Sequence, residues 1–142
     1  MTYGAHDALA DVLVDLWDYD DLTTLLEDSD AISAGWPKDE QSYPVVVRVQ
    51  PITETSGQER AGVRRQFRMQ VSVVATESWR SEQVQPTYRM AEIMSAVADR
   101  LDKDLGPENL LPGNTASGSW QDVVGNRLAL IQDWQIDSLD TS

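Results

Sequence analysis

The sequence predicts a small α+β domain spanning residues 1–142, in which a mixed or antiparallel β-sheet is packed by an N-terminal helix and a central helix. Apolar residues recur at helical spacing near the N-terminus and again from residue 86 onward. Between these segments, residues 66–75 carry the most regular two-residue alternation in the chain, which is typical of a half-buried strand. A chain of 142 residues is also long enough to bury one hydrophobic core.

The first helix is predicted from an apolar stripe with i, i+3, i+4, i+7 spacing, made of Leu9, Val12, Leu13, Leu16 and Trp17. A row of aspartates runs beside this stripe, made of Asp7, Asp11, Asp15 and Asp18. Like charges four residues apart destabilise a helix, so this helix needs salt, packing or a cationic partner. A second short helix is expected over 21–27, and residues 28–40 are expected to form a loop.

The middle of the chain predicts strands at 45–50 and 66–75. Between them, residues 53–65 are polar and contain two glycines, which indicates a long polar hairpin loop. Loops of this length in compact domains often bind a partner.

The central helix is predicted to begin at Pro86, which suits an early helical position, and to end at Gly106-Pro107. Residues 108–118 are expected to form a loop, followed by a hairpin of 120–124 and 127–137 that turns at Gly125-Asn126. Of the five tryptophans, Trp17 and Trp134 are expected in the core. Interface contact and local packing stay equally open for the other three, which are Trp36, Trp79 and Trp120.

The net charge of −13, from 24 acidic and 11 basic residues, argues against sequence-independent nucleic-acid binding and against docking on an anionic membrane. The excess lies at the two ends: residues 1–44 carry −10 and residues 101–142 carry −5, whereas residues 45–100 carry +2. Concentrated salt screens the self-repulsion of such a chain, so we favour a halophilic host over a merely acidic mesophilic protein.

No catalytic, cofactor-binding or metal-binding residue is predicted. The chain has no cysteine and one histidine, His6, close to the terminus, and it lacks the glycine-rich and nucleophile-elbow motifs of nucleotide-binding proteins and hydrolases. Asp18, Asp20 and Asp21 resemble the start of a calcium loop, but the later ligand positions do not match, so a solvated acidic helix end is preferred.

The strongest candidate for a functional surface is a group of four arginines within nine residues, Arg60, Arg64, Arg65 and Arg68. Arginine binds carboxylates through a planar fork and is enriched at protein interfaces. We expect contact with an acidic protein surface ahead of internal ion pairs, and internal ion pairs ahead of DNA phosphates.

The order of elements resembles the tail-terminator, or tail-completion, proteins of tailed viruses. The resemblance rests on the leucine-rich turn at 22–26, Trp36-Pro37 before Tyr43-Pro44 and its valine run, the alternating strand 66–75, the alanine-rich helix 88–101 and the closing strand 127–136. It implies a non-enzymatic protein of the virion tail or neck that assembles in the host cytoplasm, needs no cofactor and does not bind a membrane.

The family implies a homo-hexameric ring that caps the tail tube, contacts the tube protein and a neck or head-completion protein, and lets DNA pass through its lumen without specific binding. A ring joins two different patches of neighbouring copies. We expect the arginine group to be one patch and the aspartate row of the first helix to be the other. The alternatives are a head-completion or neck protein nearer the portal, and a non-viral halophilic binding domain or enzyme.

Overall fold

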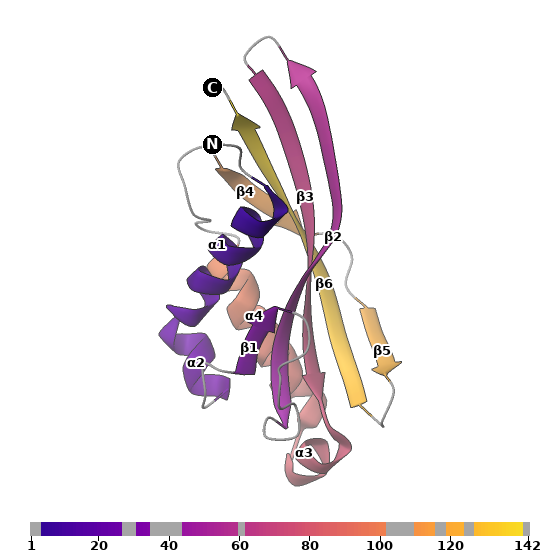
Figure 1. The fold of residues 1–142 in the computed structure, drawn as a ribbon. Coiled ribbons are helices and arrows are strands. Elements are labelled where there is room, and N and C mark those ends of the chain that lie inside the picture. The colour runs from indigo at the N-terminus through magenta and orange to yellow at the C-terminus, as the bar shows by residue number, and fades with distance from the viewer. Residues whose placement is uncertain are drawn as a thin grey trace.

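The computed structural model describes residues 4–26, 31–34, 44–59, 62–101, 110–115, 119–123 and 127–140 (Figure 1). The helices are α1 (Ala5–Trp17), α2 (Asp20–Leu26), α3 (Glu77–Glu82) and α4 (Pro86–Leu101). The strands are β1 (Ile32–Ala34), β2 (Val45–Glu59), β3 (Gly62–Ala75), β4 (Leu110–Thr115), β5 (Ser119–Val123) and β6 (Arg127–Asp140). The predicted α+β class is confirmed.

The strands form one six-stranded mixed sheet in the order β1-β2-β3-β6-β4, and β5 also pairs with β6. β1 runs parallel to β2, and all the other pairings are antiparallel. Helices α1 and α4 pack on one face of the sheet (Figure 1), which we call the helix side. The opposite face, the helix-free side, carries a small cluster of Val46, Val74 and Ala129, with Ile131 packed against it.

Helix α1 forms as its apolar stripe predicts. The Asp7 carboxylate accepts a hydrogen bond of 2.9 Å from the backbone N–H of Gly4, which satisfies a donor at the helix start. Val12 and Leu16 are fully buried, and α1 ends where the N–H of Asp18 bonds the Val14 carbonyl at 3.0 Å. The short helix α2 then buries Leu22 and Leu26.

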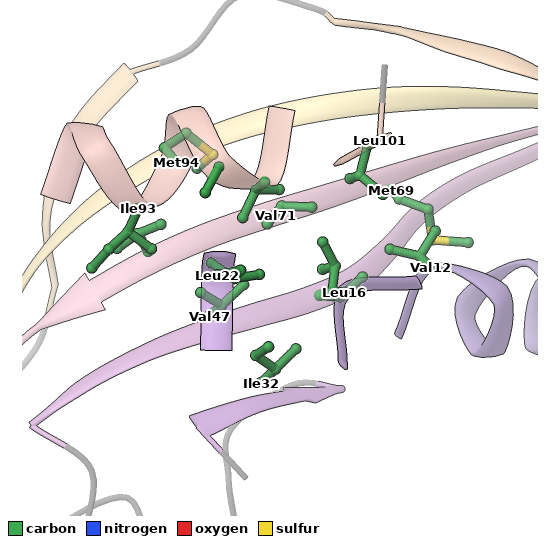
Figure 2. Close-up of a cluster of buried hydrophobic side chains, with 14 of the residues drawn as sticks. Val12, Leu16, Leu22, Ile32, Val47, Met69, Val71, Ile93, Met94 and Leu101 are labelled. Atoms are coloured by element: carbon green, nitrogen blue, oxygen red, sulfur yellow. The ribbon is translucent and has the colours of Figure 1, made fainter. Parts of the chain in front are cut away.

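The main core lies between the helices and the helix side of β2, β3 and β6 (Figure 2). Helix α4 begins at Pro86, as expected, and contributes the buried residues Met90, Ile93, Met94, Ala96, Val97 and Leu101. The strands contribute every second side chain, including Val47, Met69 and Trp134. The expectation that Trp134 belongs to the core is confirmed.

The expected polar loop at 53–65 is wrong. Strands β2 and β3 continue through it in antiparallel register as far as Glu59 opposite Gly62, and they form a long hairpin, here called the ribbon, that reaches beyond the helices (Figure 1). Strand β6 also pairs with β3 in this part of the sheet, up to Val63 opposite Asp140. A β-bulge between Pro51 and Thr53 shifts the register within this ribbon. Strands that bury little surface need no apolar alternation. The polar sequence of residues 53–65 therefore did not predict that they form strands.

Three further expectations are corrected. Residues 28–40 contain strand β1, which pairs with Val47–Val49, and residues 108–118 contain β4, which pairs with β6. Trp17 is not in the core: the residue is 42% exposed, and its Nε1 donates to the Ile32 carbonyl at 2.9 Å. Trp79 lies in α3 and packs partly buried against the core.

The predicted C-terminal hairpin is confirmed, because β5 pairs with β6 from Val123 opposite Arg127. Trp36 and the Gly125-Asn126 turn lie outside the described residues, as does the side chain of Trp120.

Candidate functional site

The predicted arginine group lies on the ribbon, on strand β3. Alternation along β3 places Arg64 and Arg68 on the helix-free side and Arg65 on the helix side, whereas Arg60 lies outside the described residues. Two arginines bind carboxylates of neighbouring strands: Arg65 Nη1 lies 3.2 Å from Glu54 Oε1, and Arg68 Nε lies 3.2 Å from Asp133 Oδ2. Internal ion pairs were the second alternative for the arginine group, and Arg65 and Arg68 form such pairs.

These ion pairs leave the two arginines exposed to different extents. The side chain of Arg68 is 48% exposed, whereas that of Arg65 is 26% exposed. Exposed ion pairs contribute about 0–1 kcal/mol to stability, so Arg68 could bind a carboxylate of a partner at little cost. The ribbon thus offers guanidinium groups on both of its faces.

The predicted aspartate row lies along α1, but its members do different things. Asp7 caps the helix start, Asp15 faces α4, and Asp18 follows the last turn and is exposed. Asp11 is half-buried. Asp18 is therefore the exposed member of this row, whereas Asp15 is bound to Arg100 and Asp7 to the helix start.

The residue that binds Asp15 is Arg100 of α4. Its Nη2 lies 3.1 Å from Asp15 Oδ1, and its Nε donates to the Asp15 backbone carbonyl at 3.2 Å. The guanidinium carbon also lies 5.6 Å from the centre of the Tyr19 ring, a cation–π distance. Arg100 therefore joins α1, α4 and Tyr19, the residue that precedes α2. This contact is not predictable from the sequence, in which the position of Arg100 next to the apolar Leu101 is the one signal.

We expect Arg100→Met to lower the free energy of unfolding by about 1–2 kcal/mol, because it leaves a poorly exposed carboxylate without its cation. Arg89→Met is the matched control: Arg89 binds Glu92 at 2.9 Å within one helix and at the surface, so its loss should cost less than about 0.5 kcal/mol. Urea unfolding curves of both variants measure the difference. Equal losses would show that Arg100 does not hold the helices together.

A shallow groove of about 420 Å³ lies between α2 and α4. It is lined by Tyr19, Asp21, Thr24, Leu25, Glu92, Ser95, Ala96 and Asp99. Partial burial raises the pKa of Tyr19, and the hydrogen bond with Asp21 and the charges of Asp21 and Asp99 raise it further, against a lowering by Arg100. The groove is thus an acidic surface with a neutral phenol at one end, and neither a nucleophile–base pair nor an anion site lines it.

The other sequence candidates for chemistry stay apart. His6 is exposed on α1. Throughout the described ranges, no group of three or more histidine, aspartate or glutamate side chains is arranged to hold a metal ion. No helix among the described residues has both the length and the apolar character needed to cross a membrane.

Comparison with known proteins finds a match in structure and none in sequence. No family model matches the sequence, and no curated protein matches it. The fold has a solved counterpart. It is a chain of a structure described as "Virion of native gene transfer agent (GTA) particle", with a TM-score of 0.76 and 16% identity over 98% of this chain and 100% of that chain. The two chains therefore share the whole fold, including the sheet and its helical layer.

Proposed function

We propose that this protein is a non-enzymatic structural component of a phage-like virion. The observation that carries the proposal is the likeness to a chain of a gene transfer agent virion, which extends over essentially the full length of both chains. The order of sequence elements supports the same class independently, because it resembles tail-terminator proteins. The surface supports it too, since the described residues offer charged contact surfaces.

Within the virion, we place the protein in a ring that terminates the tail tube and joins it to the neck or head. Its partners are then the other copies of itself in a ring of six, the tail tube protein, and a neck or head-completion protein. The number six follows from the family resemblance. Such a ring needs two different contact surfaces on each copy. The arginines on the ribbon and the aspartate row of α1 lie on separate elements and carry opposite charge, which suits that requirement.

DNA passes through the lumen of this ring without specific binding. A net charge of −13 disfavours the counterion release that drives protein–DNA association. The same acidity suits a host with a salt-rich cytoplasm, in which self-repulsion is screened.

Native mass spectrometry and negative-stain microscopy of the purified protein, at 0.1 M and 2 M KCl, test the ring. We expect closed rings of about six copies, with 2 M salt favouring compact subunits. A strict monomer under both conditions and in the presence of the tail tube protein would overturn the ring and favour a small binding domain. Rings that bind the portal side of the neck, and not the tube, would favour a head-completion protein.

Charge reversal on the ribbon tests the arginine patch. We expect the double variant Arg64→Glu, Arg65→Glu to lose ring assembly, because like charges then face the aspartate row of the next copy. The control is Arg80→Glu, Arg89→Glu, which changes the net charge equally on α3 and α4, away from the ribbon. Oligomer mass is measured for both at the lowest KCl concentration at which the unsubstituted protein assembles, because 2 M salt would screen the charges under test. A ring unchanged by the ribbon variant would remove the arginines from the contact.

A further inference from the structure

We infer that the free edge of β2 on the ribbon pairs with the free edge of β4 in a neighbouring copy, so that the sheets of successive subunits join into one continuous antiparallel sheet. This contact deepens the proposed ring and rests on it. It assigns the subunit interface to backbone hydrogen bonds, and it leaves the charged side chains to act beside it.

The first edge belongs to β2. This strand pairs with β3 along its length, but on its other side β1 covers only Val47–Val49. From Gln50 to Glu59, no strand of the described chain lies on that side, and every side chain from Gln50 to Thr55 is exposed. The ribbon therefore presents a row of backbone N–H and C=O groups to solvent.

The second edge belongs to β4, on the opposite side of the sheet (Figure 1), and no strand among the described residues pairs with its outer side. The registers align the two edges across four strands: Thr53 lies opposite Arg68, Arg68 opposite Gln135, and Gln135 opposite Asn114. A second row runs from Ser56 through Arg65 and Ser138 to Leu110. Both free edges thus lie at the same level of a sheet that is four strands wide.

Strand direction decides how two such edges meet. Strands β2, β3, β6 and β4 alternate in direction because all three pairings are antiparallel, so β2 and β4 point in opposite directions. Rotation about a ring axis that lies roughly along the strands preserves each direction. The β4 edge of one copy therefore meets the β2 edge of the next in antiparallel orientation, and the alternation continues around the ring.

The sequence of the β2 edge leaves it open to pairing. Isolated edges are usually protected by proline, lysine or bulges. Here Pro51 and the bulge lie at the start of the ribbon, and the six residues 53–58 that follow contain no proline and no lysine. The only charge among them, Glu54, is bound to Arg65. Strand β4 also has six residues, and its Pro112 falls within the register shift between Leu111 and Asn114.

Disulfide cross-linking tests this contact, because the chain contains no cysteine. Thr53→Cys, Thr55→Cys and Gly57→Cys are each combined with Asn114→Cys, which covers three registers on the helix-free side. Within one subunit, positions 53 and 114 are three strand spacings apart, about 14 Å. That distance is too long for an internal disulfide, which needs Cα atoms within about 7 Å.

After oxidation of assembled protein, at least one of these variants should shift from 15.8 kDa to a ladder of covalent multiples on a non-reducing gel. The control Thr53→Cys, Thr115→Cys should stay monomeric, because Thr115 lies opposite Trp134, in a row that belongs to the helix side. Dimers from Thr53→Cys alone would overturn the proposal in favour of a two-fold β2–β2 contact. If rings form but no variant cross-links, the edge contact is wrong and the proposed ring is unaffected. If the unsubstituted protein forms no rings, both the ring and the edge contact are wrong.

Discussion

Replacing Trp134 by alanine should lower the free energy of unfolding by about 3–5 kcal/mol, which is a large part of the stability of a domain of this size. Trp134 is 1% exposed and is among the largest fully buried side chains of the described chain. It lies on β6 opposite Met69 of β3, on the face that α1 and α4 cover. Its removal leaves a cavity that neighbouring side chains can fill only in part.

Gln135→Ala is the control for this variant. Gln135 is the next residue of β6 and points to the helix-free side, where it is exposed. Its replacement should change the free energy of unfolding by less than about 0.5 kcal/mol. Guanidinium unfolding curves in 2 M KCl give both values, and a loss below 1 kcal/mol for Trp134→Ala would contradict the packing described here.

Leu16→Ala should lower the free energy of unfolding by about 2–5 kcal/mol, because Leu16 is the largest of the fully buried side chains by which α1 packs in the core. Figure 2 shows Leu16 and Val12 in the same cluster as Ile32, Val47 and Met69. The acidic row of α1 adds repulsion within the helix, so this apolar contact also holds a helix that its own charges weaken.

Val14→Ala is the matched control, since Val14 lies on the same helix and is 50% exposed. Alanine favours the helix more than valine does, so this variant should be neutral or slightly stabilising. Thermal unfolding followed by circular dichroism compares the two. Equal melting temperatures for Leu16→Ala and Val14→Ala would mean that α1 does not depend on its buried face.

The sequence predicts those helices and strands whose buried apolar residues recur at a regular spacing. Helices α1 and α4 and the core half of β3 were all expected, because Val12, Ile93 and Val71 recur with neighbours at the period of their element. The ribbon and strands β1 and β4 were missed. These segments show no apolar periodicity from which a strand could be predicted. Strand β1 has only three residues, and the ribbon is exposed along β2.

The candidate site was predictable as a set of residues and not as a set of contacts. Arg64, Arg65 and Arg68 lie close together in the sequence, so their grouping needed no fold. Their partners Glu54 and Asp133 are set by strand register, which depends on the bulge and on a pairing more than 60 residues apart. The contact of Arg100 with Asp15 joins residues 85 apart, and only the packing of α4 beside α1 brings it about.

The extra residue at the β2 bulge reverses which side of the sheet each later residue of β2 faces. Before it, Val47 and Val49 point to the helix side, and alternation alone would send Thr53 and Thr55 after them. Because the register skips Ile52, Glu54 takes that side instead, level with Phe67, and the two threonines turn to the other. One inserted residue thus decides on which side of the sheet Glu54 lies and on which side Thr53 and Thr55 lie.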